Sequence, residues 1–126
     1  MAEACLVFFR SRECDLNAAA LSLAKCGLTV VRLGTELVVS WADSPEFRVC
    51  LDVGSHVPLE AAEIGAGTEF DAALRECNAR FEVAFDDLGA ALDEINTLMQ
   101  IQGALQIASQ GYLFLPWNGN ILGPSK

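Results

Sequence analysis

The chain has 126 residues, 52% of them hydrophobic, and this is enough for one domain whose core needs neither a disulfide nor a metal. Its 17 acidic and 8 basic residues give a formal net charge of −9, which argues against nucleic acid or an anionic membrane as partner, since both attract basic surfaces. No apolar run approaches the ~18 residues of a membrane span. We therefore predict a single soluble domain over residues 1–126, with only the last ~4 residues disordered.

The negative charge is concentrated in the middle of the chain. Residues 1–42 contain four acidic and four basic residues, whereas residues 43–94 contain thirteen acidic and three basic residues. After position 94 only Lys126 is charged. Because complementary fields speed association, the central segment predicts a basic protein as partner. The alternative is that a negative surface only keeps the protein soluble.

The five cysteines are widely spaced, form no C-x-x-C pair, and follow an N-terminus without a signal-peptide pattern. We expect a cytoplasmic protein whose thiols are reduced and mostly buried. Cys14 comes nearest to a reactive thiol, because Arg10 and Arg12 precede it. Its flanking acids, Glu13 and Asp15, oppose the lowered pKa that such reactivity requires.

The first half of the chain predicts a strand, a helix and three further strands, at residues 4–10, 16–26, 28–33, 36–41 and 47–53. The first of these is a continuous apolar run, typical of a strand buried on both faces. Asp15 is placed to cap the helix, and Gly27 to end it. A tight turn at Gly34 joins the two strands of a hairpin.

The most regular segment, residues 80–117, predicts a strand, one long helix and a second strand. The helix begins at a cap formed by Asp86 or Asp87 and ends where Gly111 adopts a left-handed conformation. A strand–helix–strand unit with one long crossover is right-handed, so its two strands are expected to run parallel in one sheet.

Shorter elements complete the order. Two short helices, at residues 59–64 and 68–77, are expected on either side of a glycine-rich break. Asn118-Gly119 favours a type I′ turn before a short final strand. The order β-α-β-β-β-α-β-α-β predicts an α+β fold with one mixed β-sheet, helices packed on one face, and a ferredoxin-like core with additions.

No catalytic, metal or cofactor site can be assembled from the sequence. His56 is the only histidine, no G-x-S-x-G nucleophile elbow is present, and the glycines at 65 and 67 follow a helix and lack a nearby lysine. We expect no catalytic residue, no metal ligand and no cofactor, and hence a protein that is not an enzyme.

Four acids around the start of the long helix, Asp86, Asp87, Asp93 and Glu94, are explained by helix capping and a solvated face. The same residues are the best candidate for a partner-binding patch. Trp117 has two interpretations of equal weight: an exposed aromatic anchor of that patch, or a cover for the sheet edge.

The long helix has one anomaly. Its apolar stripe, which includes Leu92, Ile95 and Met99, continues to Gln102 and Gln106, where the helical wheel calls for core residues. We favour a helix that changes neighbours midway and leaves the glutamines at an edge. The alternative is a pocket formed by Gln102, Gln106 and Trp117, because a buried glutamine needs hydrogen-bond partners.

These observations predict a small acidic non-enzymatic protein-binding module. Its concrete version is an inhibitor or immunity-type partner of a basic protein such as a nuclease, an analogy that rests on charge alone. The alternative is a small-molecule-binding regulatory module with a pocket near the C-terminal half of the long helix. A homodimer is compatible with both.

Overall fold

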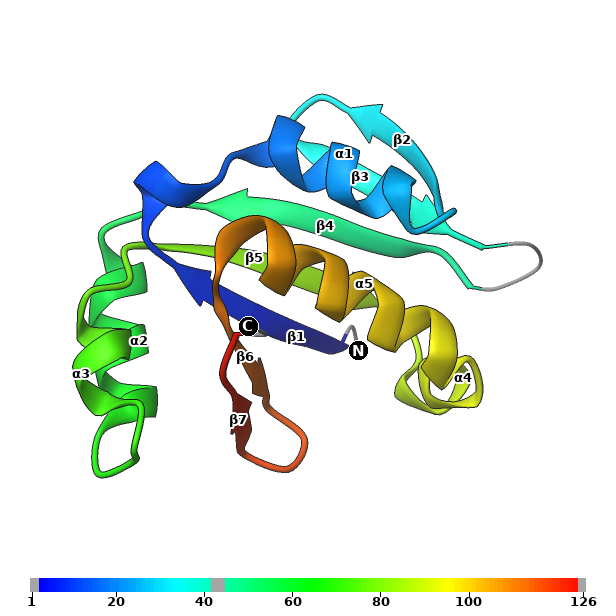
Figure 1. The fold of residues 1–126 in the computed structure, drawn as a ribbon. Coiled ribbons are helices and arrows are strands. Elements are labelled where there is room, and N and C mark those ends of the chain that lie inside the picture. The colour runs from blue at the N-terminus through cyan, green and yellow to red at the C-terminus, as the bar shows by residue number, and fades with distance from the viewer. Residues whose placement is uncertain (1–2, 42–44, 125–126) are drawn as a thin grey trace.

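The computed structural model describes residues 3–41 and 45–124, and these form one seven-stranded sheet with helices against it (Figure 1). The sequence predicts a loop at 42–46, of which residues 42–44 lie outside the described residues, as do the last two residues of the tail, where disorder is expected. In chain order the elements are β1 (Glu3–Phe9), a 3-10 turn (Ser11–Glu13), α1 (Leu16–Lys25), β2 (Thr29–Leu33), β3 (Glu36–Ser40), β4 (Phe47–Asp52), α2 (His56–Gly65), α3 (Asp71–Arg75), β5 (Ala79–Phe85), α4 (Leu88–Asp93), α5 (Ile95–Ser109), β6 (Tyr112–Leu115) and β7 (Asn120–Leu122).

The sheet is antiparallel, in the order β2-β3-β4-β5-β1-β6-β7. The predicted mixed sheet is therefore wrong, although β5 and β6 do run parallel to each other as expected. The reason is that β1 lies between them and pairs antiparallel with both. That insertion joins residues far apart in sequence, and no local pattern encodes it.

Both faces of the sheet carry helices, which corrects the prediction that helices cover one face. Alternate residues of β1 point to opposite sides, as the pleat of a strand requires. Cys5, Val7 and Phe9 pack in a large core beneath α1 and α5, which lie against each other (Figure 1). Leu6 and Phe8 pack in a smaller core with α2 and α3 on the opposite face. The continuous apolar run of β1 is explained by this two-sided burial.

Two of the predicted helix caps are present. The Asp15 carboxylate accepts a hydrogen bond from the Ala18 N–H at 2.8 Å, and the Asp87 carboxylate accepts one from the Gly89 N–H at 2.9 Å. Asp87 rather than Asp86 is thus the cap of α4. Each carboxylate satisfies a backbone donor that the first turn of a helix leaves free.

The long helix predicted after Asp87 is two helices. Glu94, with φ −106° and ψ 43°, ends α4 and precedes α5. The left-handed residue after α5 is Gln110, with φ 55°, and not Gly111. Gly111 is needed for a different reason: a Cβ there would lie 2.8 Å from the Phe8 carbonyl oxygen and 2.7 Å from a Val7 methyl carbon.

The C-terminal hairpin forms, with β7 as its short final strand. Its connection is longer than a type I′ turn, because Leu115 pairs with Asn120 across four loop residues. Of the two central residues expected to have positive φ, only Gly119 does, at 76°. Within the described part of the chain, no helix has the length and apolar character needed to span a membrane.

Candidate protein-docking surface

The four predicted partner-binding acids gather around α4. Asp86 and Asp87 precede this helix, Asp93 is its last residue, and Glu94 occupies the break before α5. The side chains of the first three are exposed and that of Glu94 is half-buried. We call these four residues the α4 acids.

One of the α4 acids is compensated by a cation. The Asp86 carboxylate accepts a hydrogen bond from Arg48 Nη2 at 2.9 Å, reaching across from the end of β5 to β4. This hydrogen bond and the charge of Asp86 raise the pKa of Arg48. Both side chains are well exposed, so the pair contributes little to stability. The other three α4 acids, Asp87, Asp93 and Glu94, form no ion pair with a described residue.

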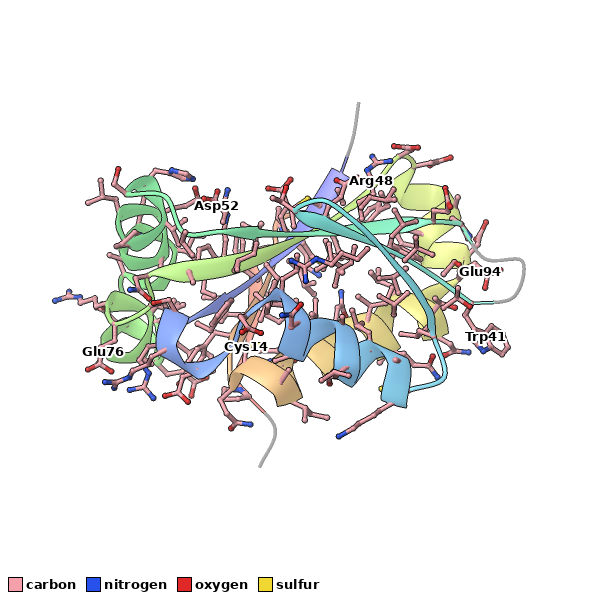
Figure 2. All side chains as sticks on the ribbon, turned by 90° about the horizontal axis from the view of Figure 1, so that it is seen from above. Cys14, Trp41, Arg48, Asp52, Glu76 and Glu94 are labelled. Carbon is pink, nitrogen blue, oxygen red and sulfur yellow. The ribbon has the colours of Figure 1, made fainter. Side chains whose placement is uncertain are left out.

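A groove of about 570 Å³ lies beside Glu94, between the end of the β2–β3 hairpin and the first turns of α5. Figure 2 shows Trp41 and Glu94 together at this end of the molecule, with Asp52 and Glu76 at the opposite end. We call it the Trp41 groove; its lining residues are Trp41, Glu94, Asn96, Thr97, Met99 and Gln100.

The two large apolar side chains of the groove are open to solvent. Trp41 is 52% exposed and Met99 59% exposed. The sequence pattern identifies neither as a surface residue: it predicts Trp41 at the end of a strand and Met99 in the apolar stripe of the long helix. Leu92 and Ile95, from the same predicted stripe, are also exposed. The predicted stripe assumes one continuous helix. Because the chain breaks at Glu94, residues of α4 and α5 do not share one continuous apolar face.

Trp117 is half-buried and packs on the core. Its ring meets the edge of the Phe85 ring, with centroids 6.0 Å apart and planes at 65°. Phe85 directly precedes Asp86, so Trp117 and the α4 acids belong to the same end of β5. This contact places the Trp117 ring against the core, and both interpretations of Trp117 stay predictions.

The glutamine anomaly has a structural explanation. Gln106 is buried, and its Nε2 donates to the backbone oxygens of Gly111, Leu122 and Gly123, each at 3.1 Å. Gln102 is also buried, and its Nε2 donates to Cys5 Sγ at 3.5 Å. The expectation that both glutamines lie at an edge is therefore wrong. These contacts use the amides within the protein, and the pocket with Trp117 stays a prediction.

The other acids of the central segment lie largely at the far end of the molecule, around a buried arginine. The guanidinium of Arg80 pairs with Glu60, with Asp52 at 3.4 Å and with Glu82 at 3.8 Å. His56 Nε2 lies 2.8 Å from Asp52 Oδ2. The pKa of Asp52 is lowered, mainly by the hydrogen bond from the Gly54 N–H and also by the hydrogen bond and charge of His56. Three carboxylates thus surround the Arg80 guanidinium, and their charges compensate the burial of this cation beside α2.

Cysteine placement follows the sequence interpretation. Cys5, Cys14 and Cys77 are buried, Cys50 is half-buried and Cys26 is exposed. Burial raises the pKa of Cys5 and of Cys77 to about 11. Burial, with the charge of Asp15, also raises the pKa of Cys14. The basic neighbours of Cys14 therefore do not activate it.

Comparison of the chain with protein-family models, with curated proteins and with solved structures found no match in any of the three.

Proposed function

We propose that this protein is a small acidic protein-binding module, and that it docks a basic partner at the Trp41 groove. The observation that carries the proposal is the groove itself, in which exposed Trp41 and Met99 lie beside Glu94, one of the α4 acids. A partner segment would place an apolar side chain between Trp41 and Met99, and lysine or arginine against Asp93 and Glu94.

The residue types suit this role. Tryptophan is enriched at the centres of protein interfaces, where an aromatic anchor is surrounded by polar groups that exclude water. Methionine is flexible and polarizable, so it adapts to differently shaped partners. The acids beside the groove would steer a basic partner and raise its association rate, and added salt would slow it. The same charge disfavours nucleic acid as partner.

An inhibitor or immunity-type role, in which the module covers the basic surface of a nuclease, is the concrete form of this proposal. Five unpaired cysteines support the cytoplasm as its location, because a reducing compartment keeps thiols free. No reacting group is required of the protein, which would act by occupying its partner's surface.

We also propose that the sheet and its helices contain a ferredoxin-like core. The elements β1, α1, β4, β5, α5 and β6 follow the β-α-β-β-α-β order, which supports a ferredoxin-like core. The β2–β3 hairpin, the α2–α3 pair and β7 would be its additions. Such a core hosts many unrelated functions, so the proposal depends on the groove and not on the fold.

The test is capture of partners from the source cell extract on three immobilised proteins: the wild type, Asp93→Lys/Glu94→Lys, and Glu63→Lys/Glu69→Lys. The last is a matched control with the same charge change on exposed acids of α2 and the loop that follows it. Quantitative mass spectrometry compares what each retains at low and at high salt.

We expect a basic protein that binds the wild type and the control, is lost from Asp93→Lys/Glu94→Lys, and is released by salt. Met99→Ser should weaken the same partner without changing the net charge. The proposal fails if no captured protein distinguishes the two charge variants, or if the one that does is acidic.

A further inference from the structure

Strand β2 is one edge of the sheet, and along the described chain it pairs only with β3. Its five residues are all extended, and each has a single partner on β3, so no bulge interrupts it. Val31 is 48% exposed and Leu33 is 55% exposed on the sheet face away from α1. This edge therefore has no bulge and exposes two apolar side chains, and Figure 1 shows β2 as the outermost strand on its side of the sheet.

The backbone of β2 has hydrogen-bonding groups directed outward. Leu33 and Glu36 flank a two-residue turn and form a hydrogen-bonded pair, and such pairs alternate along an antiparallel ladder. Val31 and Thr29 therefore bond to β3. Val30 and Arg32 direct their N–H and C=O groups away from the sheet, where a further strand would meet them.

Sheet edges are usually protected by shortness, proline, bulges or charge. The opposite edge, β7, has three residues and is followed by Pro124. β2 has none of these devices except the charge of Arg32, whose guanidinium donates to Asn17 Oδ1 and to the Gly34 carbonyl oxygen. An edge left open in this way is suited to pairing with another strand.

Beside the edge there is room for a second strand. An open groove of about 420 Å³ runs between α1 and β2, and most of its lining is apolar; it is formed by Asn17, Ala20, Leu21, Ala24, Val30 and Arg32. Leu21 is 66% exposed at its rim. If a further strand paired with β2, its side chains on the α1 face of the sheet would fill this groove.

We propose that β2 pairs antiparallel with β2 of a second copy of the chain, with Val31 opposite Val31 on the two-fold axis. Charge favours this occupant. Although the protein carries −9 overall, residues 1–42, which include α1 and β2, contain four acids and four bases and so do not repel a copy of themselves. A basic partner would find no surplus of acids here.

The register follows from the ladder. Centring on Val31 places Val30 opposite Arg32 of the second copy, so the outward backbone groups of both strands bond to each other. Leu33 then lies opposite Thr29 of the second copy, and its apolar surface continues across the axis with Val31. Centring on Arg32 instead would oppose two like charges, which is unfavourable. Pairing is isologous and closes at two copies.

Two substitutions at one position test the backbone pairing. Arg32→Pro removes an outward N–H that bonds to nothing within the sheet, whereas Arg32→Ala removes the same side chain and keeps the N–H. We expect the wild type and Arg32→Ala to sediment at twice the 13.5 kDa chain mass, and Arg32→Pro to sediment as a monomer with an unchanged circular dichroism spectrum.

A cross-linking experiment remains informative if Arg32→Pro unfolds. In a non-hydrogen-bonded pair the opposed Cα atoms are about 4.5 Å apart, a separation that a disulfide spans. Val31→Cys should therefore oxidise to a covalent dimer that reductant reverses. Val53→Cys, at a valine after β4 that is more exposed than Val31, controls for random collisions and for the native exposed Cys26.

The proposal is overturned by a wild type that stays monomeric at the highest soluble concentration, or by Arg32→Pro remaining a folded dimer. It is also overturned if Val31→Cys cross-links no faster than Val53→Cys. None of these outcomes bears on the Trp41 groove, whose partner capture is measured separately.

Discussion

Gln106 of α5 donates from its side-chain amide to the backbone oxygen of Leu122 at 3.1 Å, and so fastens the last strand to the helix. The same Nε2 also reaches Gly111 and Gly123. One buried side-chain amide thus connects α5 with the residue before β6 and with the end of β7. A polar residue on the core side of the helix is here a structural clamp.

Gln106→Leu is predicted to lower the free energy of unfolding by about 1–3 kcal/mol, since it removes the buried hydrogen bond to Gly111 and the part-buried bonds to Leu122 and Gly123. Chemical denaturation measures the change, and hydrogen exchange should show faster opening of β7. An unchanged unfolding free energy would mean that water replaces the amide and that the clamp contributes nothing.

Gln102→Leu is predicted to act in the opposite direction. The amide of Gln102 donates only to the Cys5 sulfur, at 3.5 Å, and sulfur is a weak acceptor. Replacing it by an apolar side chain of similar size should raise the unfolding free energy by about 1 kcal/mol. Loss of stability would instead indicate that the amide is needed, and would support the pocket predicted around Gln102, Gln106 and Trp117.

The elements that sequence predicted well are those whose signals are local. Asp15 caps α1 through a hydrogen bond to an N–H only three residues further along the chain. The alternation of apolar and polar residues at 47–53 likewise follows from the pleat of that strand alone. The insertion of β1 between β5 and β6 depends on residues 70 to 108 positions apart. Strand order of this kind cannot be derived from spacing in one sequence.

The candidate site was only half predictable for the same reason. The α4 acids are a charge pattern visible in the chain, and they do lie together. Trp41 comes from a hairpin more than fifty residues away, so its position beside Met99 is set by packing alone. Met99 is predicted in the core, but the break at Glu94 places it on the surface. Hydrophobic periodicity does not predict a change of backbone conformation at a single residue such as Glu94.

Glycine substitutions should separate close packing from backbone conformation. Gly111→Ala would bring a Cβ within 2.8 Å of the Phe8 carbonyl oxygen, a backbone atom that cannot move aside, and should cost about 2–3 kcal/mol. Gly103→Ala is the control within α5: in the described structure its Cβ would meet nothing within 4 Å. This change should stabilise the protein by about 0.5–1 kcal/mol through helix propensity. Thermal melts that shift in the same direction would contradict the assignment.

Asp52 is predicted to make stability depend on acid pH. Because its folded pKa is lowered, its contribution is complete above its unfolded pKa of about 3.9 and is lost as pH falls through the folded value. Asp52→Asn keeps an acceptor for the Gly54 N–H but removes the charge that faces Arg80 and His56.

The free-energy difference between wild type and Asp52→Asn should therefore be largest near pH 6 and should shrink towards pH 3. Urea unfolding at the two pH values measures it. Glu69→Gln, an exposed carboxylate near α3, should change stability by less than about 0.5 kcal/mol at either pH. A difference that grows on acidification would have the wrong sign for a carboxylate stabilised in its charged form.

Thiol labelling should follow burial. At pH 8 the pKa of about 11 keeps Cys5 and Cys77 protonated as well as shielded, so neither should react with an alkylating reagent in the folded protein. Cys26 is exposed and should be modified first. Cys50 should follow more slowly, because partial burial and Glu36 raise its pKa. Peptide mass spectrometry after timed alkylation gives the order, and addition of urea should make all five equivalent. Early modification of Cys5 would contradict its burial in the large core beneath α5, because the reagent would then reach it without global unfolding.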